Sequence, residues 1–453
     1  MRRLLLLAAS SAVFLAYNVH HWWNAPGDDW SSIWVAASMV RRGQADLIYT
    51  IDPNRFTDVG DPVAWLEAAR AVGRETLGHP YVHEPGLAYF LSLFAGPGSW
   101  LPSLHVLLVI SLLSTLGIVW LVGRMWAPVL LQPVPFAVVL LAVTLSEPFR
   151  YGLFLGQTTP VILLLTLGAV VLARRHPVLA GALLALPVSI KITPILIALW
   201  WVLDRERRKA LIGLAAGLVG LAAVQLAFID RTVVEAFVAA LRHVQRTTTT
   251  GYSNQSLVAW LVDFSVSEGQ NTYPTRTVPT WVSLVSTGLL LVFVAAVLYR
   301  AHLMRRAGTD AEPFAIAGLL LAPLPFTPLS WTHYYLLLLV PTAVLVTAAR
   351  RGGRHWPYLV VAAFIALSMQ PLAVNGPANL ASPDALIRSH LLSGLLALLA
   401  LMAIPQRVWP TRVPAPDGDH DERRNPDDWL DRPRKGDDAL AGGRGAVSAG
   451  TDR

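Results

Sequence analysis

Apolar residues follow one another in long runs along the chain, most of them about 15 to 22 residues long, with short polar stretches between them. A helical run of that length matches the hydrocarbon thickness of a bilayer, so the pattern predicts an all-α, polytopic integral membrane protein. We expect about twelve transmembrane or half-spanning helices. The expected segments are 4–22, 103–123, 133–146, 159–174, 178–190, 194–204, 210–229, 281–300, 313–327, 334–349, 357–372 and 386–404.

Basic residues gather in short clusters between these apolar runs. The clusters lie at Arg124, at Arg174 and Arg175, from Arg205 to Lys209, from Arg300 to Arg306, and from Arg350 to Arg354. Cytoplasmic loops are enriched in lysine and arginine, and assigning every cluster to the cytoplasm makes the intervening segments alternate consistently. The sequence therefore predicts a multi-pass plasma-membrane protein with both termini inside and with external segments at about 24–102, 230–280 and 372–385.

The first apolar run has two possible interpretations. Arg2 and Arg3 precede the run from Leu4 to Tyr17, which resembles the charged and hydrophobic regions of a cleaved signal peptide. No convincing small-residue cleavage site follows it. Trp22 and Trp23 come next, and tryptophans at this position are typical of the aromatic belt at a membrane surface. We therefore expect an uncleaved first span.

The pattern predicts one membrane domain over residues 1–405, followed by a disordered cytoplasmic tail at 406–453. The tail is rich in Asp, Arg, Pro and Gly and has few apolar residues. Within the domain, the apolar pieces around 178–204 are too short to cross a bilayer alone. They are expected to be half-spans or tilted pairs hinged at Pro187 and Pro194.

The first external segment carries a helical pattern from Ser31 to Arg42, with apolar residues roughly on one side. Those residues are Ile33, Trp34, Ala37 and Val40. The pattern suits a helix lying in the membrane interface, and a surface helix packed on protein fits it equally well.

Composition narrows the class of protein. The chain has 453 residues, of which 54% are hydrophobic and 14% are charged, whereas a typical soluble domain is about a quarter charged. A cytosolic enzyme is therefore excluded. The absence of cysteine excludes disulfides, thiolate metal sites and a cysteine nucleophile. The net charge of +7 comes from clusters between spans and not from one basic face, so we expect no nucleic-acid partner.

Neither a metal nor a nucleotide cofactor is expected. The histidines are scattered, and no His, Asp and Glu residues stand at metal-ligand spacing. Gly96-Pro97-Gly98 lies in an external loop and lacks the strand-to-helix context of a phosphate-binding loop. An enzyme using ATP or a nucleotide sugar is therefore disfavoured.

Asp28 and Asp29 follow the first span directly, after a Pro-Gly pair that ends the helix. A carboxylate at this place suits a helix cap, because it accepts hydrogen bonds from free N–H groups at a helix start. It equally suits a general base at the membrane edge. The sequence leaves both interpretations open.

Lys191 interrupts an apolar stretch, whereas the other two lysines, Lys209 and Lys435, lie at a predicted cytoplasmic edge and in the tail. An ammonium inside such a stretch needs an anion, and a phosphate is the interpretation we favour. The alternative is a side chain that snorkels to the interface. Glu147 and Arg150 flank a proline nearby, where they suit either a site or a surface ion pair.

Other polar groups gather at the predicted external edge. His83 and Glu84 place an imidazole and a carboxylate beside an apolar stretch, where a solvated loop is the alternative. Amide and aromatic groups occur in Asn254-Gln255-Ser256 and in Ser330-Trp331-Thr332-His333. Such groups suit a sugar ring, which has apolar faces and hydroxyl edges, and they also suit an interfacial belt without a ligand.

The ordered set of motifs resembles glycosyltransferase family 87, the polyprenol-phosphate-mannose-dependent mannosyltransferases of actinobacterial envelopes, which have the GT-C membrane fold. The resemblance covers residues 25 to 340. The matching stretches are Asp29-Trp30 with Ala36-Ala37, Gly43 and Tyr49, then Glu84-Pro85-Gly86, Gly156-Gln157-Thr158, Ala180-Gly181-Ala182-Leu183-Leu184 through Lys191-Ile192-Thr193-Pro194, Asn254-Gln255-Ser256-Leu257, and Pro328-Leu329-Ser330-Trp331-Thr332-His333.

The resemblance implies an inverting, metal-independent transfer of mannose from a polyprenyl-phosphate donor to a glycolipid or lipoglycan acceptor on the external, periplasmic face. The roles it implies cover eleven side chains. Asp29, or its neighbour Asp28, is the base; Lys191 and Arg150 bind the leaving phosphate; His333 contacts the phosphate or the sugar; Gln157, Asn254 and Gln255 hold hydroxyls; and His83, Glu84 and Trp331 belong to the acceptor side. The lipid tail is expected in a membrane groove near 178–204.

Two alternatives stay open. His83-Glu84-Pro85 replaces the aromatic-Pro-Pro stretch of the family, and His333-Tyr334 replaces its His pair, so the enzyme could transfer arabinose or glucose instead. The second alternative is a transporter with about twelve spans, although carriers place their sites at the bilayer midplane between repeated halves, and no such repeat is visible here.

Overall fold

The computed structural model describes residues 1–51, 58–249, 253–264, 275–351, 356–368, 389–405 and 408. The predicted external segment 372–385 and nearly all of the predicted tail lie outside the described residues. In the described part the chain is helical apart from β1 (Thr247–Thr249) and β2 (Thr275–Thr277), which pair antiparallel, and two isolated β-bridges. The prediction of an all-α fold is confirmed.

Each predicted apolar segment overlaps at least one of the observed helices, and several further helices lie outside these segments. The α-helices are α1 (Arg2–Trp22), α2 (Asp28–Arg41), α3 (Pro62–Ala71), α4 (Pro85–Ser92), α5 (Trp100–Met125), α6 (Pro133–Leu145), α7 (Glu147–Leu155), α8 (Thr159–Leu172), α9 (Pro177–Ile190), α10 (Ile197–Leu203), α11 (Lys209–Phe228), α12 (Arg231–Arg246), α13 (Leu257–Phe264), α14 (Thr280–Arg306), α15 (Glu312–Leu321), α16 (Pro323–Phe326), α17 (Leu339–Arg351), α18 (Trp356–Ser368) and α20 (His390–Ala403). Short 3₁₀ turns are η1 (Ala45–Leu47), η2 (Pro128–Leu131), η3 (Thr193–Leu196), η4 (Arg205–Arg207) and η5 (Thr332–Leu338).

Prolines account for many of these helix starts. Proline occupies one of the first two positions of α3, α4, α6, α7, α8, α9 and α15. The first N–H groups of a helix have no partner inside it, so the missing N–H of proline costs nothing there and its fixed φ favours the helix. The same residue blocks continuation of the preceding helix, which separates α6 from α7 at a bend of 56°.

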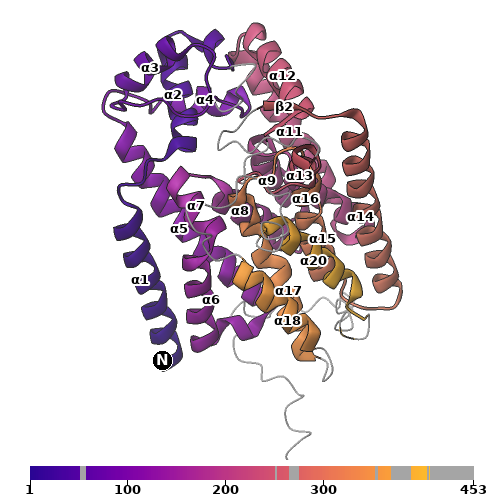
Figure 1. Ribbon diagram of the computed structural model, residues 1–453. Coiled ribbons are helices and arrows are strands. Elements are labelled where there is room, and N and C mark those ends of the chain that lie inside the picture. The colour runs from indigo at the N-terminus through magenta and orange to yellow at the C-terminus, as the bar shows by residue number, and fades with distance from the viewer. Residues whose placement is uncertain are drawn as a thin grey trace, which may run out of the picture. The chain divides into compact units, whose positions relative to one another are not determined.

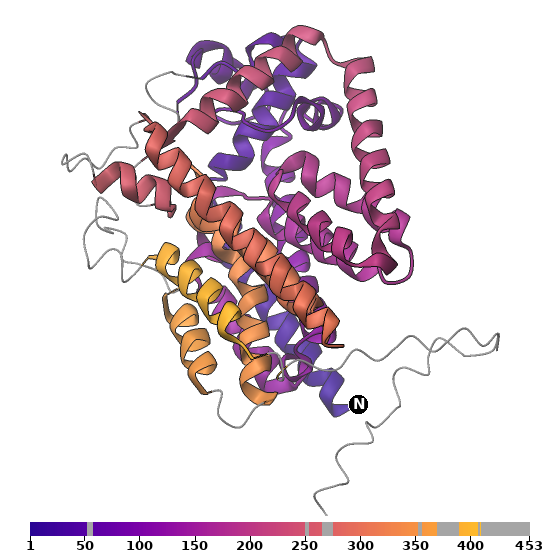
Figure 2. The same cartoon turned by 90° about the vertical axis from the view of Figure 1, so that its right-hand side faces the viewer.

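Five helical segments in the described part are long and apolar enough to cross a membrane, or six if the bent pair α6 and α7 is one span. They are Arg2–Trp22, Trp100–Met125, Arg205–Phe228, Thr280–Arg306 and Thr332–Arg350. Figures 1 and 2 show α1 and α14 on opposite sides of the helices between them. The predicted count of about twelve spans is not confirmed, because the remaining apolar helices have only 10–17 residues.

The largest hydrophobic core joins α8, α9, α10, α14, α15, α17 and α20. Within this half of the protein, α9 and α11 pack with their backbones nearly touching. A Cβ on Gly181 would lie 1.8 Å from the Ala210 carbonyl oxygen, and a Cβ on Gly213 would lie 1.8 Å from that of Val178. Small residues allow such close approach between membrane helices, where dispersion contacts replace the hydrophobic effect as the source of association.

Residues 24–99 form a second apolar core around α2, together with α12. Trp65, Tyr81 and Met39 are fully buried there. The predicted helix at Ser31–Arg42 is present as α2, but it is buried on all sides from Trp30 to Met39. The predictions of an interfacial helix and of a surface helix are therefore both wrong, because α3, α4 and α5 pack around the helix.

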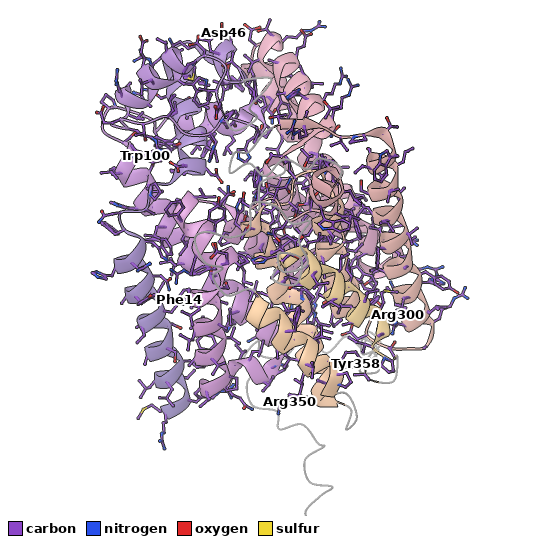
Figure 3. The ribbon with its side chains drawn as sticks, in the orientation of Figure 1. Phe14, Asp46, Trp100, Arg300, Arg350 and Tyr358 are labelled. Atoms are coloured by element: carbon purple, nitrogen blue, oxygen red, sulfur yellow. The ribbon has the colours of Figure 1, made fainter. Side chains whose placement is uncertain are left out.

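A buried ionic cluster lies at the ends of α8, α10, α14 and α15. The carboxylates of Asp204 and Glu312 are each 1% exposed. Arg207 bridges the two carboxylates and lies 2.9 Å from Glu312, while Arg174 pairs with Glu312 and Arg305 lies 3.2 Å from Asp204. These arginines belong to the basic clusters that the sequence indicates only as topology markers. In Figure 3 Arg350 lies at the opposite end of the described helices from Asp46, which belongs to the 24–99 segment.

Candidate active site

Two glycines bring the start of α2 against the end of α7. Gly27 and Gly156 both have left-handed backbone, with φ of 63° and 70°. The Gly27 N–H donates to the Phe154 carbonyl oxygen at 3.1 Å, and a Cβ on Gly156 would lie 2.8 Å from the Cβ of Trp30. Only glycine fits both the conformation and the space. This contact places the first turn of α2 beside the residue that follows Gly156.

That residue is Gln157, whose side chain links Asp29 to Lys191. The Gln157 Nε2 donates to Asp29 Oδ2, and its Oε1 accepts from Lys191 Nζ at 3.4 Å. Lys191 Nζ also lies 3.3 Å from Thr159 Oγ1 and 3.9 Å from the centroid of the Tyr334 ring. A carboxylate, an amide and a lysine amine from three distant parts of the sequence therefore meet at one point, at the start of α2, which packs against α7.

The contacts of Lys191 differ from those of a lysine that snorkels to the interface. Its backbone is extended in the break between α9 and η3, so the side chain leaves the helix and turns to polar and aromatic partners. An ammonium over a ring face is stabilised by the ring quadrupole, more strongly where water is excluded. The Nζ of Lys191 is therefore held beside Gln157, Thr159 and the face of the Tyr334 ring.

Asp29 has a second neighbour on its other oxygen. His79 Nε2 lies 3.5 Å from Asp29 Oδ1, and the imidazole is 42% exposed. Burial raises the pKa of Asp29 above its ordinary value, while His79, the hydrogen bond from Gln157 and the charge of Lys191 partly offset that rise. A carboxylate with a raised pKa is a stronger base than an exposed one once it is ionised.

Asp28, although adjacent, has a different environment. Arg74 Nη2 lies 2.6 Å from Asp28 Oδ1, and its Nη1 donates to the Pro26 carbonyl oxygen at 2.7 Å. The guanidinium also covers the Trp100 ring at 4.6 Å and is only 6% exposed. Gly27 occupies the N-cap of α2, so the prediction that one of these carboxylates caps the helix is wrong.

His83 and Glu84 adjoin the same region. His83 Nδ1 lies 3.4 Å from the Ile190 carbonyl oxygen, directly before Lys191, and burial followed by the charge of Lys191 lowers the pKa of His83. Glu84 caps α4 by accepting from the Gly86 N–H at 2.7 Å, and it also accepts from Gln225 at 2.6 Å. Neither residue stands in a solvated loop.

His333 is buried, and neither ring nitrogen has a hydrogen-bond partner among the described residues. Its ring meets the Tyr334 ring edge-on, with centroids 4.6 Å apart, and Tyr334 is the ring that Lys191 covers. A buried polar group without a partner costs free energy, so two such nitrogens beside a fixed cation favour a ligand at this position.

Asn254, Gln255 and Trp331 occupy the junction between two chain segments. Asn254 Nδ2 donates to the Thr249 and Pro328 carbonyl oxygens at 2.9 and 3.1 Å, and its Oδ1 accepts from the Ser330 N–H at 2.9 Å. Gln255 Oε1 accepts from the His390 N–H at 2.9 Å, and Asn254 forms a β-bridge with Trp331. These side chains are engaged in holding the backbone together.

Arg150 lies on α7 with its guanidinium 5.8 Å from the centroid of the Trp22 ring. Trp22 and Gln157 both line a small crevice between α1, α5 and α7. The other lining residues are mostly apolar: Ala25, Leu104, His105, Leu107, Leu108, Ser111, Gly152, Leu153 and Gly156. Arg150 therefore stands beside a small, mostly apolar crevice that Gln157 also lines.

Sequence reasoning did not single out Arg74, His79 or Thr159. Arg74 and His79 stand in the loop between α3 and α4, which carries no motif, and only the fold brings that loop to α2. Tyr334 stands out in the sequence only as the residue that follows His333, where the family has a second histidine. No periodicity in the sequence could indicate these contacts, because each joins segments that are far apart.

Comparison with known proteins bears on this site. The model of glycosyltransferase family 87 matches residues 81–320, a range that includes Gln157 and Lys191 but neither Asp29 nor His333. Two relatives are named polyprenol-phosphate-mannose-dependent alpha-(1-2)-phosphatidylinositol mannoside mannosyltransferase. The one from Mycolicibacterium smegmatis is 28% identical over 252 residues, which are 55% of this chain and 52% of that protein.

The one from Mycobacterium tuberculosis is 28% identical over 345 residues, which are 70% of this chain and 75% of that protein. The chain thus spans about half the length of the first relative and three quarters of the second. No solved structure gives a significant match.

Proposed function

Because the chain belongs to glycosyltransferase family 87, we propose that it transfers a mannosyl residue from a polyprenyl-phosphate donor to a glycolipid or lipoglycan acceptor. The transfer inverts the anomeric centre, needs no metal, and takes place on the external face of the plasma membrane. The observation that carries the proposal is the Asp29–Gln157–Lys191 bridge, which combines a base, an amide donor and a phosphate-binding cation.

In this proposal Asp29 Oδ removes the proton of the acceptor hydroxyl as its oxygen attacks the anomeric carbon. The bond from that carbon to the phosphate oxygen breaks on the opposite side, and the negative charge passes to the departing polyprenyl phosphate. Lys191 neutralises this charge, which is why a phosphate ester leaves without a metal. Inversion needs the base and the leaving group on opposite faces of the sugar, and one amide side chain separates Asp29 from Lys191.

The surrounding groups take supporting roles. His333, with two buried ring nitrogens lacking partners among the described residues, contacts the phosphate or the sugar. Gln157 donates to a sugar hydroxyl once the donor is bound, and Arg150 attracts the anionic lipid towards the crevice. His83 and Glu84 belong to the acceptor side because they adjoin Lys191 through Ile190.

The proposal assigns Asn254, Gln255 and Trp331 to the support of the site, since the described contacts of both amides go to backbone groups or to Thr248. Asp28 is likewise assigned to support, through Arg74. The external location is supported by Asp29, which belongs to the 24–99 segment, and by Arg350, which lies at the opposite end of the described helices from Asp46 of the same segment (Figure 3).

The test is transfer by the purified protein of radiolabelled mannose from polyprenyl-phosphate-mannose to envelope lipid extracts. A new mannolipid would support the proposal, and its stereochemistry would report inversion. Transfer only from the arabinose or glucose donor would replace mannose in the proposal. Uptake of a solute into proteoliposomes without transfer would favour a transporter and overturn it.

A further inference from the structure

His79 lies against the first turn of α2, because the residue before it, Gly78, packs so closely on that turn that a side chain would not fit there. A Cβ on Gly78 would lie 1.7 Å from Ser31 Oγ and 2.9 Å from the Asp28 carbonyl oxygen. Four residues earlier, Arg74 binds Asp28 and the Pro26 carbonyl oxygen, so the segment 74–79 is fixed to the start of α2 at both of its ends. The position of the His79 imidazole is therefore set by the packing of the 74–79 segment against α2.

The two oxygens of Asp29 have separate partners. Oδ2 accepts from Gln157 on the side of Lys191, and Oδ1 faces His79 Nε2 at 3.5 Å. The exposed fraction is 21% for the Asp29 side chain and 42% for the His79 side chain. Asp29 therefore lies between the partly exposed imidazole of His79 and the side chain of Gln157, which leads to the proposed donor site at Lys191.

We propose that His79 is the positioning residue through which Asp29 returns its proton to water after each glycosyl transfer. This inference rests on the proposed function, in which Asp29 is the base. The acceptor proton passes first to Asp29 as the glycosidic bond forms. It then moves from Asp29 Oδ1 to His79 Nε2, and the imidazolium releases a proton to water, which restores both groups without any redox change.

The other charged and titratable groups around Asp29 do not provide this route. The Nζ of Lys191 contacts Gln157, Thr159 and the Tyr334 ring, and in the proposed function it binds the phosphate. Asp28 is paired with the nearly buried guanidinium of Arg74. Imidazole takes up and releases protons near neutral pH, and distances in a site without substrate commonly shorten when the reacting groups assemble.

The test compares His79→Gln and His79→Ala in the intact protein, with His176→Ala as the matched control. His176 is an exposed histidine next to the start of α9. Mannosyl transfer by both His79 variants is expected to fall about tenfold or more at neutral pH. Added imidazole should restore transfer by His79→Ala, because the vacated position is partly open to water, and should not affect Asp29→Asn or His176→Ala.

A second measurement needs no turnover. Infrared titration of the carboxyl band that is lost in Asp29→Asn gives the protonation midpoint of Asp29 directly. His79 lowers the pKa of Asp29 in the wild type, so His79→Gln should raise that midpoint.

Wild-type transfer by both His79 variants, or a loss that imidazole does not restore together with an unchanged midpoint, would overturn the proposal. Undiminished transfer by Asp29→Asn would instead overturn the base assignment, and the relay with it. If only the relay is wrong, Asp29→Asn is inactive while His79→Gln behaves as the wild type.

Discussion

Arg74 pairs with Asp28 at 2.6 Å, while the adjacent carboxylate of Asp29 faces away from Arg74 towards Gln157. Two neighbouring residues in the first turn of a helix point in different directions, so one is sequestered in an ion pair and the other reaches the candidate site. This division of roles supports Asp29 as the base, and it makes the pair a test with an internal control.

Asp29→Asn is expected to lower transfer by about 10²- to 10⁴-fold, because the amide keeps the shape of the carboxylate but cannot accept the acceptor proton. The measurement is turnover by proteins matched for expression. Asp28→Asn should keep transfer and lose stability, since it leaves the buried guanidinium of Arg74 without its counter-charge. An inactive Asp28→Asn beside an active Asp29→Asn would move the base back by one residue.

Lys191→Met should weaken use of the lipid-phosphate donor, because it removes the ammonium while keeping much of the length and apolar volume of the side chain. The KM for the donor should rise more than the KM for the acceptor. Lys209→Met is the control, since Lys209 begins α11 and is not among the described hydrogen-bond partners of Lys191. Unchanged donor kinetics in a normally folded Lys191→Met protein would remove Lys191 from the phosphate site.

Transfer should increase with pH through the pKa of Asp29, which burial raises. A base acts in its ionised form, so activity is lost as the pH falls through that raised pKa. The same rise in the pKa of Asp29 has the opposite effect on stability, because the ionised form that supports activity is the less stable form of the fold. An aspartate whose pKa is higher in the folded than in the unfolded state destabilises the fold when it is ionised.

Asp29→Asn should therefore unfold at a higher temperature than the wild type at neutral pH. The difference should shrink as the pH falls through the raised pKa of Asp29 and vanish below the ordinary pKa of aspartate, about 3.9, where both folded and unfolded states are protonated. Thermal unfolding of the two proteins across pH measures it. A lower unfolding temperature for Asp29→Asn at neutral pH would contradict the prediction.

Glu312→Gln should destabilise the fold by about 3–5 kcal/mol, because the arginines around this buried carboxylate would lose their counter-charge. Glu235→Gln is the control: Glu235 pairs with Arg231 at 2.8 Å, but both side chains are largely exposed, so the cost should be below about 1 kcal/mol. Unfolding of both variants in one detergent compares them. Equal stabilities would mean that the buried cluster contributes no more than a surface pair.

Reporter fusions after Arg208 and after Thr248 test the topology. We expect a cytoplasmic reporter to be active at the first position and a periplasmic reporter at the second, since basic clusters favour the cytoplasmic side. Activity of a reporter that works only in the periplasm at the first position would reverse the assignment.

Much of the fold follows from local sequence. The apolar runs place the helices, and prolines such as Pro133 and Pro177 set where helices begin, because both effects act within a few residues of the chain. The lone lysine in an apolar stretch was visible for the same reason: the cost of its charge depends on its immediate neighbours. What local sequence did not provide was which of the short helices cross the membrane, since that depends on how they pack.

The site itself was decided by tertiary structure. Asp28 and Asp29 are chemically identical side by side, and only the position of Arg74 separates their roles. Gln157 meets Asp29 because two left-handed glycines far apart in the chain allow their backbones to touch, and His79 meets it because Gly78 leaves no side chain in the way. Such contacts leave no periodic or compositional signal in the sequence. The sequence alone therefore shows which residues are present but not which of them lie together.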